Sequence, residues 1–240
     1  KCLESVINQT YKDKEIIVVY DESQDNTYKI LNEFQYQITV IEKNSGSVTR
    51  AIHDGIDVMT GDWFMYLGSD DILNPDAIEE LISEAKKLNN EKYILYSNYN
   101  IINSSGEILR KFIEPNNNHL KKIELDVILL DHYFGNFSCS LIHKSLFKKY
   151  GLLDEKYALV VDYELWLRFV ITFGCKLHLV PKILFNYRQQ NESVTQTRVE
   201  QCIKEAEDLI PQFLSRLDPK IRSDYEQKLN EYKKNKPFKY

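Results

Sequence analysis

The sequence predicts an α/β fold in which helices flank a mostly parallel sheet and a C-terminal helical tail follows. Between residues 15 and 97, short runs rich in β-branched and aromatic residues alternate with segments of helical periodicity. The apolar runs are continuous, which is typical of strands buried on both faces. After residue 198 the pattern changes to long, charged helical segments. We therefore predict a domain over residues 1–197 and a helical appendage over residues 198–240.

The first part of the chain is interpreted as a series of strand–helix units. Strands are predicted at residues 15–20, 38–41, 63–67 and 93–97. Helices are predicted at residues 27–34, 47–59 and 75–87, the last with Pro75 in its first turn. Strands and helices that alternate at this spacing form βαβ units with parallel strands.

The second part departs from this alternation. Ser104, Ser105 and Gly106 are turn residues, and they predict a hairpin between strands at 99–102 and 108–112. The remaining predicted elements are a helix at 120–130, a strand at 137–142, a helix at 162–172, a strand at 176–184 and charged helix at 199–233. Trp166 falls on the apolar face of its helix and is expected in the core.

The charge balance and the cysteines restrict the class of protein. The net charge is −5 at pH 7, whereas nucleic-acid binders normally have a basic excess, so we expect no nucleic-acid partner. No apolar stretch approaches the ~20 residues that a membrane-spanning helix needs. The cysteines are scattered and form no C-x-x-C pair, which favours a cytoplasmic protein with reduced thiols.

Two adjacent carboxylates follow the third predicted strand. Asp70 and Asp71 come just after residues 63–67, and ligands of open α/β sheets bind at the carboxyl ends of strands. Mg²⁺ and Mn²⁺ commonly take one or two carboxylates and complete their coordination with water and phosphate oxygens. The pair therefore predicts a cation site, with capping of the helix that starts near Asn74 as the alternative.

An ordered set of motifs resembles the family 2 glycosyltransferases, which have the GT-A fold. The family segments include S-V-L-x-Q-T-Y, E-I-I-V-V-D-D-G-S-x-D-x-T, L-D-x-D-D-x-L, E-D-x-[DE]-L-W-L-R and Y-R-x-H-x-x-S-V. No single match is specific, whereas the ordered set is. The matching segments are residues 5–11 (SVINQTY), 15–27 (EIIVVYDESQDNT), 44–46 (NSG), 55–56 (GI), 60–63 (TGDW), 67–73 (LGSDDIL), 151–155 (GLLDE), 162–168 (DYELWLR), 187–188 (YR) and 193–194 (SV).

The resemblance implies a role for three of the carboxylates. Asp70 matches the second acid of the D-x-D motif, which binds Mn²⁺ or Mg²⁺. Asp162 matches the catalytic base, which takes the proton of the acceptor hydroxyl. Asp21 matches an acid that contacts the nucleotide. The alternatives are that Asp21 is a turn residue and that Asp162 caps the helix that follows it.

The resemblance also implies a set of donor-binding residues. Ser23 lies in the nucleotide-binding turn and Ser69 in the acidic turn. Asp71 either supports the metal ligand or binds a donor hydroxyl. Arg50 and Arg188 are expected to face the donor phosphates. For Arg50 the alternative is a helix-surface position, and for Arg188 it is a surface ion pair.

The chain departs from the family pattern at Tyr20, Glu22, Gly68, Val161 and Gln190. Tyr20, Gly68 and Val161 stand where the family has acids, and Gln190 stands where it often has histidine. These departures support an alternative, a catalytically degenerate sugar-nucleotide-binding module. A sugar nucleotidyltransferase is a further alternative, although the Gly-rich basic loop of such enzymes is absent near the start.

The function that the resemblance implies is that of an inverting, metal-dependent, non-processive glycosyltransferase. The expected donor is a sugar linked to UDP, GDP or dTDP, and the expected acceptor is a glycan or a lipid-linked molecule in surface polysaccharide synthesis. The basic residues 233–240 raise a peripheral contact with the inner membrane face as an open alternative. A homodimer through the C-terminal helices is also left open.

The start of the chain carries a separate expectation. Residues 1–9 read as the end of an amphipathic helix, without an initiator methionine. Family members begin with a strand that lies centrally in the sheet, and loss of a central strand leaves two unpaired edges. We therefore expect further residues before Lys1, or else an unstable fragment.

Overall fold

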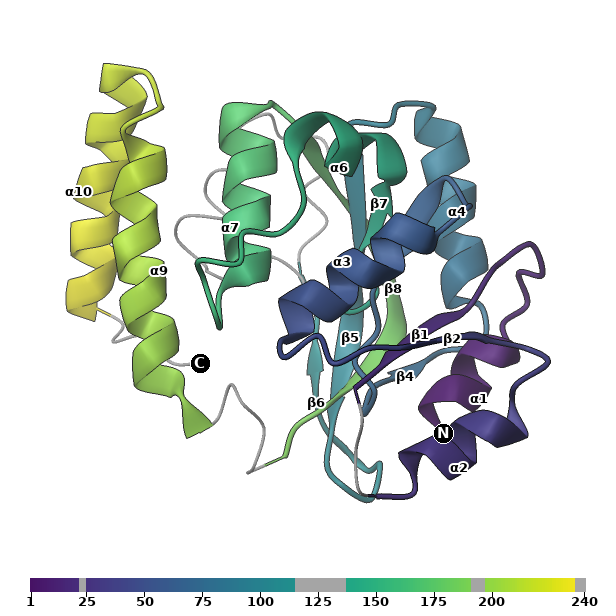
Figure 1. Ribbon diagram of the computed structural model, residues 1–240. Helices are drawn as coiled ribbons and strands as arrows, with labels where there is room; N and C mark the ends of the chain where they lie inside the picture. Colours follow the sequence, from purple (N-terminus) through teal and green to yellow (C-terminus); the bar gives the residue numbers. More distant parts are fainter. Residues whose placement is uncertain (22–24, 115–136, 191–196, 236–240) are drawn as a thin grey trace.

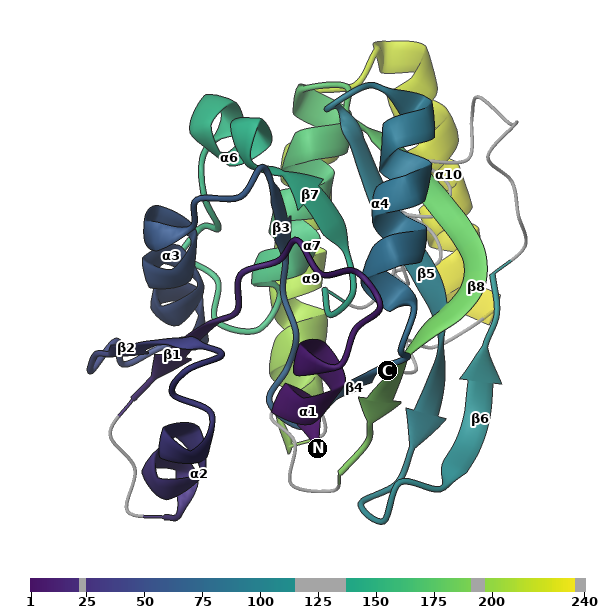
Figure 2. The ribbon, with the colours of Figure 1, turned by 90° about the vertical axis from the view of Figure 1, so that its right-hand side faces the viewer.

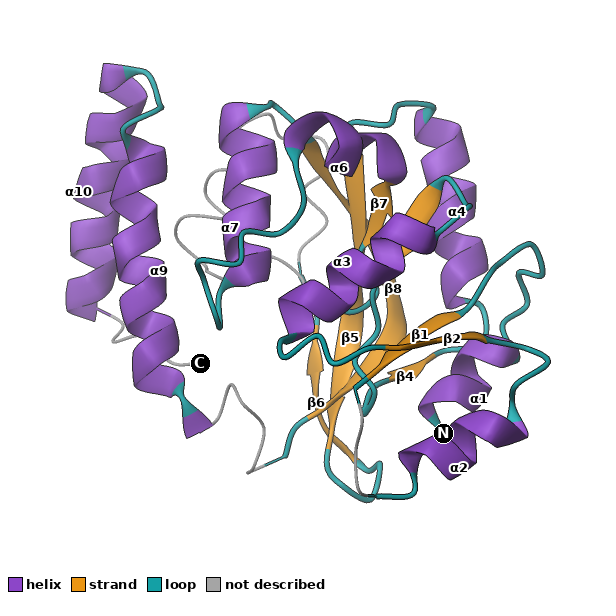
Figure 3. Cartoon of the chain, viewed as in Figure 1, coloured by secondary structure: helices purple, strands orange, loops and turns teal. Residues whose placement is uncertain are grey.

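A computed structural model of the chain describes residues 1–21, 25–114, 137–190 and 197–235. Its strands form a larger sheet with helices around it and a smaller, two-stranded sheet (Figures 1 and 3). The predicted α/β class is confirmed. The predicted helix at 120–130 lies outside the described residues.

The smaller sheet is the first strand–helix–strand unit of the chain. β1 (Ile17–Tyr20) and β2 (Thr39–Glu42) are parallel, and α2 (Thr27–Glu33) lies between them in the sequence. α3 (Val48–Val58) follows and packs against β1. These elements agree with the predicted ones to within a few residues.

The larger sheet has the strand order β3-β7-β5-β8-β4, and β6 pairs with β5. The strands are β3 (Trp63–Met65), β4 (Ile72–Leu73), β5 (Tyr93–Ile102), β6 (Ile108–Phe112), β7 (Leu141–His143) and β8 (Lys176–Arg188). β5 and β8 are parallel, with Ile94 opposite Leu177. The other pairs of this sheet are antiparallel. The sheet is therefore more mixed than expected, in part because the tight turn after β5 forces β6 to return antiparallel.

Helices cover both faces of the larger sheet (Figure 2). α1 (Cys2–Ile7) and α4 (Ala77–Leu88) contribute to the core on one face, together with Leu95 of β5. Ile94, the neighbour of Leu95, points to the opposite face because side chains alternate along a strand. The helices there are α3, α6 (Lys144–Tyr150), α7 (Val161–Leu167) and α9 (Val199–Leu214).

Two helical regions differ in detail from their predictions. α7 continues into a π-helical segment, Arg168–Thr172, so the predicted helix at 162–172 is confirmed in extent but is not uniform. The predicted helix at 199–233 is a hairpin of α9 and α10 (Pro219–Asn235) (Figure 1). Four side chains of α9 that are buried in the main core are Cys202, Ala206, Leu209 and Phe213. α9 is thus part of the core, although its charge suggested an appendage.

Gln9 fixes the start of α4 to the end of α1. Its side chain is fully buried, and its Nε2 donates to the carbonyl oxygen of Asn74 at 2.6 Å. Its Oε1 accepts from the N–H of Ile78 at 3.0 Å, which satisfies an otherwise unpaired donor in the first turn of α4. Ser5 Oγ accepts from the N–H of Leu73 at 3.1 Å. α1 therefore positions the segment that follows the acidic turn.

No ladder joins the two sheets among the described strands, since β1 pairs with β2 and β3 pairs with β7. The strand expected before Lys1 stays a prediction. In the described part of the chain, no helix is long and apolar enough to cross a bilayer.

Candidate functional site

The acidic turn after β3 places its two carboxylates in opposite environments. The turn is closed by a hydrogen bond from the N–H of Asp71 to the carbonyl oxygen of Gly68 at 3.1 Å. Asp70 and Ser69 are exposed, whereas Asp71 is only 2% exposed. Adjacent residues with the same charge are therefore available for different roles.

Both oxygens of Asp71 are hydrogen-bonded. Oδ2 accepts from Ser138 Oγ at 2.7 Å, and Oδ1 accepts from the N–H of Arg188 at 2.9 Å. Burial raises the pKa of Asp71 to about 6, against the two hydrogen bonds, which favour the charged form. This placement favours support of the turn by Asp71 over direct contact with a donor hydroxyl.

Arg188 is buried at the end of β8, 8% exposed. Its Nε donates to the carbonyl oxygen of Asp70 at 2.8 Å, and its Nη1 donates to those of Asn103 and Ser104 at 2.7 and 3.0 Å. Among the described residues the guanidinium binds main-chain oxygens and forms no ion pair, so the suggested surface ion pair has no support there. Within the described residues, Nη2 has no hydrogen-bond partner.

Asp162 lies in the first turn of α7 and is partly buried. Its Oδ1 accepts from the N–H of Tyr163 at 2.9 Å, and burial raises its pKa. No lysine, arginine or histidine of the described residues forms an ion pair with it. The N-cap of α7 is Val160, so Asp162 is not the cap that the alternative interpretation expected.

Tyr66 connects the acidic turn with Asp162. Burial, together with the negative charges of Asp71, Asp70 and Asp162, raises the pKa of Tyr66 to about 12. The three carboxylates, which are far apart in the sequence, therefore act on one hydroxyl. No motif in the sequence pointed to Tyr66, although its position two residues before Gly68 was a usable signal.

An aromatic stack supports this arrangement from the core side. Tyr66 stacks on Phe137 with ring centroids 5.1 Å apart, and Phe137 meets Trp166 edge-on at 5.7 Å. Trp166 is 1% exposed, which confirms its predicted place in the core. The stack links the end of β3 to α7.

Asp21 holds the loop that leads into α3. Its Oδ1 accepts from the N–H of Ser45 at 2.8 Å and its Oδ2 from that of Gly46 at 3.3 Å. Gly46 has a φ of +69°, which favours glycine. The interpretation of Asp21 as a turn residue therefore has direct support, and nucleotide contact stays a prediction. Ser23 lies outside the described residues.

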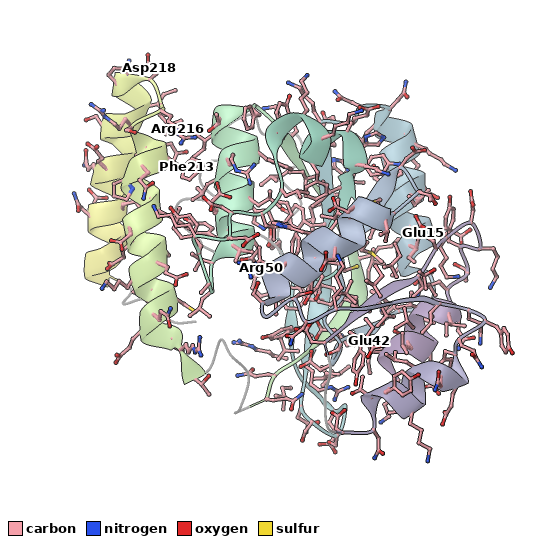
Figure 4. All side chains as sticks on the ribbon, viewed as in Figure 1. Glu15, Glu42, Arg50, Phe213, Arg216 and Asp218 are labelled. Carbon is pink, nitrogen blue, oxygen red and sulfur yellow. The ribbon has the colours of Figure 1, made fainter. Side chains whose placement is uncertain are left out.

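Arg50 lies on α3 and faces solvent (Figure 4). Its Nε donates to Glu155 Oε2 at 2.9 Å, with the two side chains 62% and 46% exposed. The pair links α3 to the segment before α7. Contact of Arg50 with donor phosphates stays a prediction.

The donor set at Asp70 fits a hard cation held by a single protein carboxylate. Gln190 Nε2 donates to Asp70 Oδ2 at 3.3 Å. Within the described ranges, no cluster of three histidine, cysteine or acidic side chains is arranged to hold a metal ion. Mg²⁺ and Mn²⁺ accept such a site when phosphate oxygens and water complete the coordination.

Glu164 and Arg168 form a second acid–base cluster, which the sequence analysis assigned no separate role. Arg168 Nε and Nη2 donate to Glu164 Oε1 and Oε2 at 2.8 and 3.0 Å. Arg168 also binds the carbonyl oxygens of Tyr150 and Leu152. The spacing of four residues on a helix was the signal for this pair.

The chain matches the family model described as Glycosyl transferase family 2 over residues 1–151. It is 33% identical over 218 residues to an uncharacterized glycosyltransferase of Rickettsia typhi, which covers 90% of this chain and 67% of that protein. It is 26% identical over 171 residues to the chondroitin synthase of Pasteurella multocida, which covers 70% of this chain and 17% of that one.

Solved structures resemble the fold. S. aureus TarS 1–349 in complex with UDP aligns with a TM-score of 0.69 at 16% identity, over 96% of this chain and 65% of that one. The same fragment with UDP-GlcNAc aligns with a TM-score of 0.69 at 15% identity, over 96% of this chain and 66% of that one. The predicted GT-A fold is thereby confirmed, and the chain spans about two thirds of the TarS fragment.

Proposed function

The chain belongs to glycosyl transferase family 2, and we propose that it moves a sugar from a nucleotide diphosphate to an acceptor hydroxyl, with inversion and with Mn²⁺ or Mg²⁺. The observation that best supports this proposal is that Asp70 is an exposed carboxylate in the turn that Ser138 and Arg188 hold through Asp71, while Asp162 lies without an ion-pair partner among the described residues. The arrangement offers one carboxylate for a cation and another for a proton.

Asp162 is the proposed catalytic base. Among the described residues no cation neutralises it, and burial raises its pKa, so its ionised form is more basic than an ordinary aspartate. A base of this kind suits the removal of the acceptor proton while the acceptor oxygen attacks the anomeric carbon. A single displacement of this type inverts the anomeric configuration.

Asp70 is the proposed protein ligand of the cation. Its carboxylate is exposed, and its hydrogen bond to the Gln190 amide leaves room for further contacts. A bound cation would offset the negative charge that develops on the departing diphosphate. Ser69 precedes this ligand in the turn, and Arg188 Nε binds the carbonyl oxygen of Asp70, so both residues are proposed to contact the donor.

The donor and acceptor are proposed from the names of similar proteins. The TarS structures contain UDP and UDP-GlcNAc, which supports a uridine nucleotide before GDP or dTDP. The synthases of Pasteurella multocida are named for chondroitin and hyaluronan, which supports a glycan acceptor in surface polysaccharide synthesis. A lipid-linked acceptor would require contact with the inner membrane face.

A catalytically degenerate binding module is the second candidate. Gly68 stands where the family has the first acid of the metal motif, and Gln190 stands where it often has histidine. Such a module would bind a sugar nucleotide without turnover.

The test is calorimetric titration of UDP, GDP and dTDP into the protein, with and without Mn²⁺, followed by an assay for sugar transfer. Asp70→Ala is compared with Asp76→Ala, which removes an exposed carboxylate that makes no cap hydrogen bond at the nearby start of α4. Mn²⁺-dependent binding of one nucleotide that only Asp70→Ala abolishes is the expected result. Binding without transfer to any acceptor favours the degenerate module. A folded protein that binds no nucleotide contradicts both candidates.

A further inference from the structure

The hydroxyl of Ser138 joins the two ends of the acidic turn. It accepts a hydrogen bond from the N–H of Gly68 at 3.2 Å and donates one to Asp71 Oδ2 at 2.7 Å. Ser138 is 2% exposed, so these contacts are shielded from water. A hydrogen bond between a hydroxyl and a buried carboxylate is stronger than one between neutral groups.

The main chain around Ser138 is fixed to β3. Ser138 forms a bridge with Tyr66, and the N–H of Cys139 donates to the carbonyl oxygen of Tyr66 at 3.1 Å. Cys139 has a φ of +63°, a conformation that non-glycine residues adopt rarely and that persists only where the surroundings hold it. The hydroxyl of Ser138 is therefore presented to the turn from a constrained segment.

Gly68 leaves the space in which the carboxylates lie. A Cβ atom at this position would come within 3.1 Å of Asp71 Oδ2 and 3.2 Å of Asp70 Oδ1. Its backbone is outside the positive-φ region, so steric contact is the main cost of a side chain there. The aspartate that the family motif has at this position would therefore crowd the observed place of Asp71.

We propose that Ser138 is a positioning residue of the donor site, which holds Asp71 beneath the turn so that the Asp70 carboxylate faces the cation and the donor phosphates. This arrangement requires a residue without a side chain at position 68, and Gly68 meets that requirement. Arg188 completes it from the opposite side through its N–H to Asp71 Oδ1 and its Nε to the Asp70 carbonyl oxygen. This inference rests on the proposed function. It also accounts for Gly68, which stands where the family motif has aspartate: the support of the turn comes from Ser138 instead of from an acid at residue 68.

Two variants test the hydrogen bond between Ser138 Oγ and Asp71 Oδ2, one at the donor and one beside the acceptor. Ser138→Ala removes the donor, and Gly68→Ala pushes a methyl group against the acceptor. We expect each variant to weaken Mn²⁺-dependent UDP binding about tenfold, as for the loss of one hydrogen bond to a charged group. Binding of UDP without Mn²⁺ is expected to stay unchanged. Mn²⁺ bound in the presence of UDP, measured by electron paramagnetic resonance, should fall in parallel.

Ser140→Ala is the matched control, because Ser140 lies on the same segment and is 1% exposed. For Ser140→Ala we expect a lower melting temperature but no change in the ratio of the UDP affinities measured with and without Mn²⁺. Ser138→Thr keeps the hydroxyl and should restore the ratio. Gly68→Ala leaves Ser138 intact, and it decides the question if Ser138→Ala does not fold.

Folded Ser138→Ala and Gly68→Ala proteins with the wild-type affinity ratio would overturn the inference while leaving the proposed function in place. Wild-type protein that binds no UDP, GDP or dTDP with Mn²⁺ would instead overturn the proposed function, and this inference with it.

Discussion

Two regions of the molecule combine an acidic residue with an arginine, and they do so in opposite ways. Just after α7, Arg168 makes two hydrogen bonds to the two carboxylate oxygens of Glu164, which is 4% exposed. Its remaining donors bind main-chain oxygens at the end of α6 and in the segment that follows it. Both charges of this pair are therefore satisfied, as a buried ion pair requires.

The acidic turn avoids that arrangement. Arg188 gives its side-chain hydrogen bonds to carbonyl oxygens and only its main-chain N–H to Asp71. Among the described residues, neither Asp70 nor Asp162 forms an ion pair with a lysine or arginine. A carboxylate already paired with a guanidinium is a weak cation ligand and a weak base, whereas an unpaired one is available. The two regions therefore separate scaffold from chemistry in the following sense. Acids that are paired with arginine stabilise the fold, whereas unpaired acids are candidates for binding and catalysis.

The largest effect should follow from Asp162→Asn. If Asp162 is the base, the amide cannot accept the proton, and kcat should fall by about 100- to 10,000-fold. Steady-state transfer from the donor that calorimetry identifies measures this loss. Donor affinity is expected to remain within about threefold of wild type, because the base faces the acceptor.

Glu164→Gln is the matched control two residues away on the same helix. It changes a paired carboxylate to its amide, and it should lower stability more than catalysis of the folded fraction. Equal losses of kcat in the two variants would contradict the separation of scaffold from chemistry.

Arg168→Ala should cause the largest loss of stability. The change leaves the Glu164 carboxylate buried without its partner and frees the carbonyl oxygens of Tyr150 and Leu152. Breaking a buried pair in this way costs about 3–5 kcal/mol. Chemical denaturation measures the free energy of unfolding, and Arg222→Ala, which removes an exposed pair with Glu226, serves as the control. A loss below about 1 kcal/mol would place Arg168 with surface pairs.

The pH dependence of activity should report the raised pKa of Asp162. Its ionised form is the base, so kcat should fall as pH decreases through the pKa of this carboxyl. Because burial raises that pKa, the acid limb should lie above the ordinary aspartate value of about 3.9. A pH–rate profile over the range in which the protein stays folded measures it, and activity that is flat down to the unfolding pH argues against the base role.

The same shift has a consequence for stability. The folded protein holds the proton of Asp162 more tightly than the unfolded chain does, so ionisation disfavours folding as pH rises through this window. Asp162→Asn should therefore be more stable than wild type at neutral pH. The gain should disappear below about pH 3.9, where both folded and unfolded wild type are protonated.

Local signals in the sequence were sufficient for the elements with continuous apolar runs or clear helical periodicity. β1, α3, α4 and β6 were predicted close to their observed bounds, whereas β5 is one strand over the two that were predicted at 93–97 and 99–102. β4 was missed because its two residues have no local signature and exist as a strand only through pairing with β8. α6 was also missed, because it is short and its N-cap is the ring of His143, an unusual N-cap residue.

Local sequence signals were also insufficient for part of the candidate site. The motif order identified Asp70 and Asp162, whose residue types the chemistry requires. The inward turn of Asp71 depends on Ser138, 67 residues away, and on Arg188, 117 residues away. The stacking of Tyr66 on Phe137, and the edge-on contact of Phe137 with Trp166, likewise depend on bringing β3 and α7 together. Contacts of this length leave no periodic trace in a single sequence.

Replacement of Arg50 should have the smallest effect, because this side chain lies at the surface. Its pair with Glu155 is exposed on both sides, so Arg50→Ala should lower the free energy of unfolding by only about 0.2–1 kcal/mol. Its Nε is bound to Glu155, which leaves its Nη groups for a donor phosphate. We therefore expect the donor KM to rise roughly two- to tenfold, as for the loss of one exposed hydrogen bond.

Glu155→Gln distinguishes the two roles of Arg50, because it weakens the ion pair and keeps the arginine. Both variants should lose the same small amount of stability, measured by chemical denaturation. Only Arg50→Ala should raise KM. If KM is unchanged in both, Arg50 belongs with the scaffold, since a surface arginine that is already paired contributes neither to binding nor, by more than a fraction of a kcal/mol, to folding.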